Sequence, residues 1–192
     1  MKLIILDRDG VINHDRPKGV RSPEQWEPLP GSLEAIARLT QAGYQIAVAT
    51  NQSGIARGVL DLDTLYAIHR KMHEMVVKAG GHIDVIAFCP HSDANECQCR
   101  KPMPGMLYSI NERLSVDMQS VYLVGDSLRD LQAAMAAGAN PIVVKTGKGM
   151  ETLESNKGLD HIPTYDDLGA FVDQLLDESG AEKNSSAAKR NI

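Results

Sequence analysis

Two aspartates, Asp7 and Asp9, stand two positions apart directly after a short apolar run near the start of the chain. In extended backbone, residues at this spacing point to the same side, and Arg8 between them points away. A second acidic segment supplies Asp126 and Asp130. Carboxylates gathered at one place repel one another unless a cation joins them, and hard oxygen ligands with room for water favour Mg²⁺. We therefore predict a magnesium site among these carboxylates.

The same residue types predict phosphoryl transfer through a carboxylate nucleophile. In this hypothesis Asp7 attacks phosphorus while a metal ion neutralises the phosphoryl oxygens. Asp9 protonates the leaving oxygen and later activates water, and we expect its acidic neighbours to raise its pKa. Thr50 and the backbone N–H groups at Asn51 could hold phosphoryl oxygens. Lys101 would add a compact positive charge to the same group.

A plainer interpretation of these acids is structural. Asp9-Gly10 is a common turn pair and by itself predicts no chemistry. That interpretation leaves the acids at the other predicted strand ends without an explanation. Asp130 is different, because an acid in the first turn of a helix is stabilised by the helix dipole. We therefore assign Asp130 a supporting role.

All three cysteines of the chain lie within eleven residues of one another and beside a histidine, as Cys89, His91, Cys97 and Cys99. Three thiolates and one imidazole are a complete ligand set for a closed, tetrahedral zinc site. Four protein ligands leave no position for water, so we predict a structural Zn²⁺ that stiffens the loop before Arg100 and Lys101. The alternative is three reduced cysteines without a metal. A redox role is disfavoured, because Cys-x-Cys is not the usual Cys-x-x-Cys dithiol.

Two further patterns resemble known motifs only in part. His69 and His73 are four positions apart on a predicted helix, but no Glu follows His69 as the zinc-protease motif requires. We interpret both histidines as members of a solvated helix face. Residues 145–149 read Lys-Thr-Gly-Lys-Gly and lack the full phosphate-loop frame, so nucleotide binding is not predicted.

Strand-like and helix-like patterns alternate along the chain, which predicts an α/β fold with a doubly wound parallel sheet. We predict helices that begin near residues 32, 63, 105 and 130, with Asp63 as the N-cap of the second. The predicted strands cover residues 2–6, 45–49, 83–88, 121–124 and 141–144. Because such sheets carry their sites at the carboxyl ends of the strands, Asp7, Thr50 and Asp126 should meet at one edge.

The 192 residues suit one domain, which we place at residues 1–178, with a zinc loop at 89–99. A disordered tail is predicted over 179–192, where Ser, Ala and Lys predominate. The intervals between Asp9, Thr50 and Lys101 are too short for a separate cap domain. We therefore expect an open site.

Composition argues against several classes of function. The net charge of −5 and the aromatic content of 4% disfavour a nucleic-acid binder, and the charge also disfavours docking on anionic membranes. The 43% hydrophobic and 23% charged residues are typical of a soluble globular protein. With no signal peptide or membrane span recognised, we expect a cytoplasmic protein, and a monomer.

Four segments, in this order along residues 2–150, resemble the motifs of the haloacid dehalogenase superfamily: Asp7 to Asn13, Thr50 to Gly58, Cys89 to Pro102, and Gly125-Asp126. More narrowly, the chain resembles the heptose bisphosphate phosphatases and the related histidinol-phosphate phosphatases. Asp-x-Asp-Gly alone is weak, but together with Thr-Asn-Gln-Ser-Gly and Cys-Arg-Lys-Pro it is specific.

The resemblance implies residue roles by position. Asp7 matches the nucleophile and magnesium ligand, and Asp9 matches the acid/base whose carbonyl also binds magnesium. Asp126 matches the second magnesium carboxylate. The candidates for binding phosphate and sugar are Asp15, Thr50, Asn51, Gln52, Ser53, Arg57, Arg100 and Lys101.

The implied reaction is Mg²⁺-dependent removal of the 7-phosphate from D-glycero-D-manno-heptose 1,7-bisphosphate through an aspartyl-phosphate, in the supply of heptose for lipopolysaccharide cores. The expected partner is thus a phosphorylated sugar. Two alternatives stay open: histidinol phosphate as the substrate, and a non-catalytic zinc-loop module that binds phosphorylated partners. The choice between the α and β anomers of the heptose also stays open.

Overall fold

The computed structural model describes the backbone of residues 2–155 and 158–188, and the side chains of residues 2–155 and 158–179. In this part of the chain, six strands form one parallel sheet. They are β1 (Lys2–Leu6), β2 (Tyr44–Asn51), β3 (Val85–Cys89), β4 (Tyr122–Gly125), β5 (Asn140–Val144) and β6 (Thr164–Tyr165).

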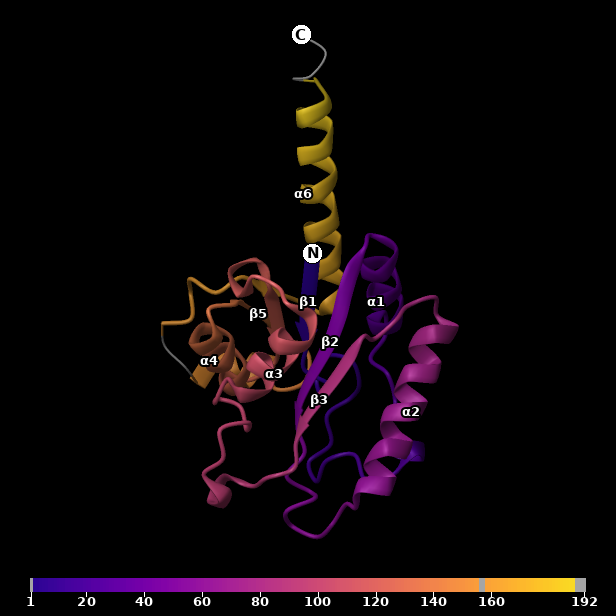
Figure 1. Cartoon of the computed structure of the whole chain (residues 1–192), viewed down its shortest axis with the longest axis vertical. Coiled ribbons are helices and arrows are strands. Elements are labelled where there is room, and N and C mark those ends of the chain that lie inside the picture. The colour runs from indigo at the N-terminus through magenta and orange to yellow at the C-terminus, as the bar shows by residue number, and fades with distance from the viewer. Residues whose placement is uncertain (1, 156–157, 189–192) are drawn as a thin grey trace.

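Helices follow the strands in turn (Figure 1). The α-helices are α1 (Ser32–Gln41), α2 (Leu62–Lys78), α3 (Gly105–Leu114), α4 (Leu128–Ala137), α5 (Gly149–Ser155) and α6 (Leu168–Ala188). Three single-turn 3-10 helices lie in the connections, as η1 (Pro23–Gln25), η2 (Asp93–Asn95) and η3 (Met118–Ser120). None of the helices within the described residues combines the length and the apolar composition needed to cross a membrane.

The strand order is β3-β2-β1-β4-β5-β6. The chain therefore builds one half of the sheet outward from β1, returns to lay β4 beside β1, and then builds the other half in the opposite direction. The loops that follow β1 and β4 leave the sheet in opposite directions, which opens a crevice at their carboxyl ends. The predicted doubly wound parallel fold is confirmed.

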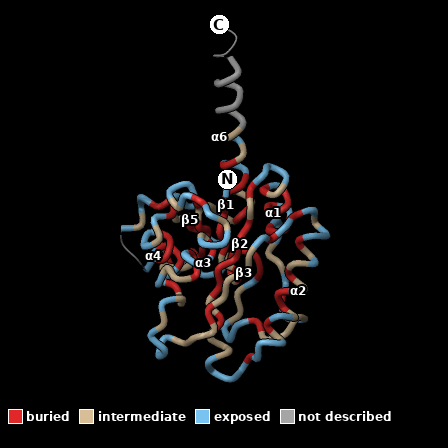
Figure 2. The backbone as a smooth tube through the Cα atoms, in the orientation of Figure 1, coloured by how far each residue is buried: buried red, intermediate tan, exposed pale blue. Residues whose placement is uncertain are grey.

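Alternate residues of the central strands face two separate layers of helices. Ile4 and Leu6 of β1 belong to a core formed with α1, α2 and α6. Leu3 and Ile5 belong to a second core, formed with α3 and α4. Since successive side chains of a strand point to opposite faces, an unbroken apolar strand is what a sheet covered on both sides requires. Figure 2 shows the buried strands between these layers.

One element prediction needs correction, and the predicted tail over 179–192 stays a prediction. The N-cap of α2 is Asp61, whose side chain accepts the Thr64 N–H at 2.7 Å, and Asp63 lies inside the first turn. Along α6, helical backbone continues through residues 179–188, where a tail is predicted. The buried residues Phe171 and Val172 fix the first part of this helix on the core. Residues 189–192 of the predicted tail lie outside the described residues.

Candidate active site and metal centre

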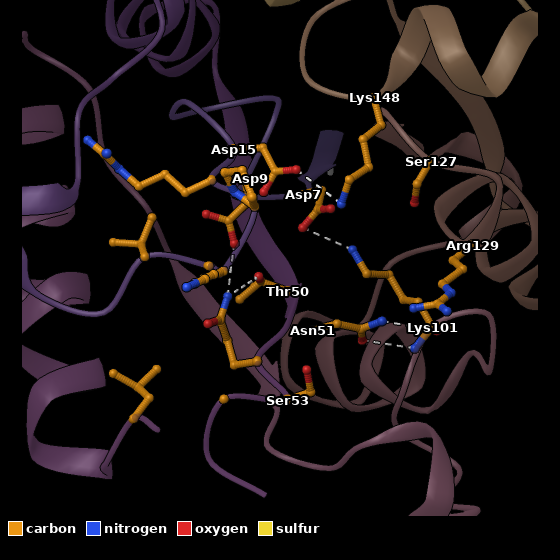
Figure 3. A pocket seen from close by; sticks show the side chains of 18 of the residues that line it. Asp7, Asp9, Asp15, Thr50, Asn51, Ser53, Lys101, Ser127, Arg129 and Lys148 are labelled. Carbon is orange, nitrogen blue, oxygen red and sulfur yellow. Dashed lines mark hydrogen bonds and ion pairs between the residues drawn. The ribbon is translucent and has the colours of Figure 1, made fainter. Parts of the chain in front are cut away.

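Asp7 and Asp126 follow β1 and β4, the two strands at the switch point of the sheet. Figure 3 shows Asp7 in the middle of a pocket, with Lys101 and Lys148 directed toward it. The side-chain oxygens of Asp7, Asp126 and Asp130 lie within 4.8 Å of one another. The structure thus brings Asp7 together with Asp126, which is 119 positions further along the chain, as the strand-end argument predicts.

Lys101 forms the cationic centre of this acidic cluster. Its side chain is 2% exposed, and its Nζ lies 3.0 Å from Asp7 Oδ1 and 2.5 Å from Asp130 Oδ1. The ammonium also donates to the Ala49 carbonyl oxygen at 2.6 Å. Burial alone would lower the pKa of Lys101, but the Asp130 and Asp7 carboxylates outweigh it and raise that pKa above its ordinary value. Lys101 is therefore a fixed positive charge beside Asp7.

Two of the acids resist ionisation in the absence of a cation. Burial raises the pKa of Asp7 well above its ordinary value; the Lys101 ammonium opposes this shift, and repulsion from Asp130 and Asp126 adds to the effect of burial. Burial and the Asp130 carboxylate likewise raise the pKa of Asp126 to about 7. A divalent cation among these oxygens would remove both penalties, so the donor set fits Mg²⁺.

Asp130 has a supporting contact on each side. Its carboxylate accepts the backbone N–H of Ser127 at 3.0 Å in a capping box at the start of α4, and it also accepts the Lys101 ammonium. The carboxyl group is fully buried. Asp130 therefore ties the start of α4 to Lys101, and its supporting role stays a prediction.

Asp9 differs from Asp7 in its surroundings. Its carboxylate accepts hydrogen bonds from Arg8 Nη2 at 2.9 and 3.1 Å, from Asn13 Nδ2 at 2.8 Å and from Gln52 Nε2 at 3.1 Å. Burial favours the protonated acid, but the Arg8 charge and these donors outweigh burial and lower the pKa of Asp9. The expected upward shift is therefore wrong for Asp9, because its side chain faces donors rather than the other acids.

Arg8 is a site residue that the strand-end pattern did not identify. Its side chain is fully buried, whereas the alternation of an extended strand predicts that it points away from Asp9. Arg8 Nη1 lies 3.2 Å from Nε2 of His69 on α2. Burial and the Arg8 charge lower the pKa of His69 to about 3, so this ring is neutral. The prediction that His69 belongs to a solvated face is wrong, because α2 directs it into the interior, where it is 6% exposed.

The loop at residues 145–149 supports the acidic centre from the far half of the sheet. The Lys148 N–H donates to Asp126 Oδ2 at 2.8 Å, and Thr146 Oγ1 donates to the Gly10 carbonyl oxygen at 2.6 Å. Gly10 and Gly147 both have positive φ, 84° and 58°, and a Cβ on either would collide with the Asp126 carboxylate. This loop resembles a phosphate loop in part of its sequence. In the structure it lies beside Asp126 and donates a hydrogen bond to its carboxylate.

The pocket above these groups has a volume of about 490 Å³. All eight residues predicted to bind phosphate or sugar line it: Asp15, Thr50, Asn51, Gln52, Ser53, Arg57, Arg100 and Lys101. The Asn51 side chain is already occupied, because its amide bonds both the N–H and the carbonyl oxygen of Lys101 at 3.0 Å. Asn51 therefore positions Lys101, while the chemical roles of the other lining residues stay predictions.

Further cations that the sequence did not single out also line the pocket, and Lys148 and Arg129 are two of them. Lys148 Nζ lies 3.0 Å from Asp15 Oδ2, which joins the loop after β1 to the loop after β5 across the mouth. Arg129 Nη2 lies 3.6 Å from Asp93 Oδ2. The sequence could have indicated both residues, because Arg129 follows β4 and Lys148 follows β5, at the sheet edge where the site was expected.

The four candidate zinc ligands lie together at the end of β3, with donor atoms within 4.8 Å of one another. The Sγ–Sγ distances are 3.3, 3.5 and 3.6 Å, and His91 Nδ1 lies 3.3 and 3.7 Å from two of the sulfurs. Zinc–sulfur bonds of about 2.3 Å in a tetrahedron give Sγ–Sγ edges of about 3.8 Å, whereas a disulfide requires about 2.05 Å. The donor set therefore fits Zn²⁺.

This loop is linked directly to the pocket. The Arg100 side chain donates to Asp93 Oδ1 at 2.6 Å and to the His91 carbonyl oxygen at 3.3 Å. The cluster thus includes Cys99, directly before Arg100, and His91, whose carbonyl oxygen Arg100 contacts; Lys101 follows Arg100 into the acidic centre.

Comparison with known proteins agrees with this architecture. A model of the HAD-hydrolase-like family matches residues 98–170, from the end of the cysteine cluster into α6. Together with the sheet order and the aspartates after β1 and β4, this match makes the chain a hydrolase of the haloacid dehalogenase-like class.

Curated relatives define the family more closely. The D-glycero-beta-D-manno-heptose-1,7-bisphosphate 7-phosphatase of Bordetella bronchiseptica is 53% identical over 93% of this chain and 100% of that protein. The enzyme of the same name from Pseudomonas putida is 50% identical over 92% of this chain and 100% of its own length. The chain belongs to this family of heptose bisphosphate phosphatases.

A solved structure matches equally well. The D,D-heptose 1,7-bisphosphate phosphatase from B. bronchiseptica, complexed with magnesium and phosphate, superposes with a TM-score of 0.90 at 53% identity, covering 93% of this chain and 99% of that one.

Proposed function

We propose that this protein is a Mg²⁺-dependent phosphomonoesterase that removes the 7-phosphate from D-glycero-D-manno-heptose 1,7-bisphosphate. The observation that carries the proposal is Asp7 at the base of an open pocket, 3.0 Å from the buried Lys101 ammonium and within reach of Asp126. The relatives that share half of the sequence are named for this reaction.

Asp7, Asp126 and the backbone carbonyl of Asp9 would hold the magnesium ion. The raised pKa values of Asp7 and Asp126 support a cation between these carboxylates. When bound, the ion would neutralise the phosphoryl oxygens and keep Asp7 in its ionised, nucleophilic form.

In the first step an Asp7 carboxylate oxygen attacks phosphorus, and the bond between phosphorus and the sugar oxygen breaks. That oxygen takes a proton from the Asp9 carboxyl group and leaves as an alcohol. The lowered pKa of Asp9 describes the free site; a phosphate dianion beside it raises its affinity for a proton by like-charge repulsion. Lys101 lies where it can neutralise charge on the transferring group.

In the second step the Asp9 carboxylate removes a proton from water. The resulting oxygen attacks phosphorus, the bond to Asp7 breaks, and inorganic phosphate leaves. Both carboxyl groups then return to their starting protonation states, with Asp9 carrying the proton that it donates in the next cycle.

The charge of the pocket supports a doubly phosphorylated substrate. Arg57, Arg100 and Arg129 line the pocket outside the centre formed by Lys101 and Asp7. We assign these guanidinium groups to binding of the second phosphate. The open pocket leaves room for the carbon chain of the heptose. Histidinol phosphate carries an ammonium group that these cations would repel, so we rank it below the heptose bisphosphate.

Zn²⁺ bound by Cys89, His91, Cys97 and Cys99 would hold the loop that carries Arg100 and Lys101. Thiolate ligands of this kind persist in a reducing compartment, which supports the cytoplasm as the place of action.

Turnover measurements test the proposal. We expect hydrolysis of both heptose 1,7-bisphosphate anomers to exceed that of histidinol phosphate, with one anomer preferred. EDTA should abolish phosphate release, and added Mg²⁺ should restore it. Equal, poor turnover of all three esters would exclude the substrate assignment. A complete lack of hydrolysis of an aryl phosphate with Mg²⁺ would exclude the phosphatase in favour of a binding module.

A further inference from the structure

The Asp9 carboxylate is fixed from three sides, and each donor is held in turn. Asn13, which donates to Asp9, accepts the Trp26 indole N–H at 2.9 Å. Gln52, the second donor, also donates to Thr50 Oγ1 at 2.9 Å. The third donor is Arg8, and it is the only one of the three that carries a charge.

Arg8 has few partners for a fully buried guanidinium group. Nη2 donates to both oxygens of Asp9, Nη1 lies 3.2 Å from His69 Nε2, and Nε has no hydrogen-bond partner among the described residues. Leaving a buried donor without a partner destabilises the folded protein. Because Nε already lacks a partner, the orientation of the group depends on the contacts at Nη1 and Nη2.

His69 is built to accept from Arg8. A guanidinium group can only donate, so the lone pair must be on His69 Nε2 and the ring proton on Nδ1. The His69 ring packs edge-to-face against Phe88 of β3, with centroids 6.0 Å apart, and this contact fixes its plane. The acceptor thus comes from α2, a helix that otherwise contributes no side chain to the pocket lining.

We propose that His69 is a positioning residue for Asp9, acting through Arg8. By accepting Nη1 it holds the guanidinium group in the one orientation that directs the Asp9 carboxyl group toward the leaving oxygen. Without this acceptor the Arg8 group would turn to find another, and Asp9, bonded to Nη2, would move with it. The inference rests on the proposed function only for the role of Asp9 as the proton donor.

The consequence depends on the leaving group. Proton transfer needs heavy atoms about 2.6–3.2 Å apart, and a displacement of about 1 Å can cost about 10²-fold in rate. A sugar or other alkyl oxygen is a poor leaving group and needs the proton. Nitrophenolate leaves without it, so formation of the phosphoenzyme from an aryl ester should not respond to the position of Asp9.

The test compares His69→Leu, which removes the acceptor, with His69→Gln, which keeps an oxygen at similar reach. The matched control is His73→Leu, one turn further along α2. Rates of the first turnover, measured by rapid quench with saturating Mg²⁺, are compared for an alkyl phosphate and for 4-nitrophenyl phosphate. We expect His69→Leu to slow the alkyl ester by about 10²-fold and the aryl ester little. His69→Gln should recover most of the loss, and His73→Leu should show none.

An equal loss with both esters, or full activity of His69→Leu on the alkyl ester, would overturn the inference. If His69→Leu does not fold, His69→Asn replaces it, because its shorter side chain does not reach Arg8. The heptose bisphosphate is the alkyl ester of choice. If the wild-type protein does not hydrolyse it, the proposed substrate fails, and the same comparison is made with another alkyl phosphate that the protein does hydrolyse.

Discussion

Asp7 and Asp9 are two positions apart, yet their environments shift their pKa values in opposite directions. Asp7 shares a buried space with Asp126 and Asp130, which raises its pKa, whereas Arg8 and neutral donors lower the pKa of Asp9. Two carboxyl groups in different surroundings are suited to different roles. A cation would ionise Asp7, while the network around Asp9 orients it without a metal.

Substitution of each acid should separate these roles. Asp7→Asn removes the nucleophile, so every phosphate ester should become inert. Asp9→Asn keeps the nucleophile but removes the proton donor, which typically costs about 10²–10⁴-fold with a sugar phosphate. With 4-nitrophenyl phosphate, Asp9→Asn should release one equivalent of nitrophenol in a burst and then stall, because water attack lacks its base.

Mass spectrometry of the quenched burst should find one phosphoryl group on Asp7. The division of roles is wrong if both variants fail alike on the aryl ester, with no burst and no phosphoenzyme.

At the scale of elements, the loop between β3 and α3 joins a candidate metal centre to the substrate pocket. Three thiols and His91 gather where β3 ends, and Arg100 bonds back to the loop through Asp93 and the His91 carbonyl oxygen. Arg100 and Lys101 therefore depend on this loop for their positions.

Cys97→Ser should uncouple the loop from the pocket. It removes one thiolate, so we expect zinc to be lost, KM to rise and the melting temperature to fall, while the magnesium requirement is unchanged. Glu96→Gln, at the exposed neighbouring position, is the matched control and should keep its zinc. Metal analysis of protein purified without chelators decides the point: wild-type protein free of zinc would contradict the structural site.

Elements whose signal is local could be predicted from the sequence. The strand at residues 2–6 was predicted with its observed bounds, because an apolar run ends there at a charged residue. The strand β6 was missed, since two residues carry no periodic signal, and the helices α5 and α6 were not predicted. The cap of α2 was misplaced by two positions, because Asp61 and Asp63 both suit that role.

The residues of the site also divide into those with a signal in the local sequence and those without one. Asp7, Thr50 and Asp126 were predicted to meet because each follows a predicted strand of a parallel sheet, and together with Lys101 they line one pocket. The contact between Arg8 and His69 was not predicted, because these residues are 61 positions apart and no spacing in the sequence indicates that they meet. Such contacts depend on the angle at which α2 crosses the sheet.

For the whole molecule, the doubly wound order separates the parts that do chemistry from the parts that stabilise the fold. The site lies at the carboxyl ends of the strands, whereas Figure 1 shows α6 extending past the amino end of β1. Phe171 of α6 is 2% exposed and packs edge-to-face against the Tyr122 and Tyr165 rings, at 5.7 and 5.4 Å between centroids. Stability and activity should therefore respond to different substitutions.

Phe171→Ala tests this separation. Removing a buried phenyl ring typically lowers the free energy of unfolding by about 3–5 kcal/mol, which urea denaturation would measure. The kcat/KM of the folded protein at 25 °C should be unchanged, because Phe171 packs against the tyrosines of β4 and β6 and is not itself one of the residues that line the pocket. Val77→Ala, at a half-exposed position, is the control and should change stability by less than about 0.5 kcal/mol. A fall in kcat/KM with Phe171→Ala, measured where the variant is fully folded, would instead mean that packing under β4 sets the position of Asp126.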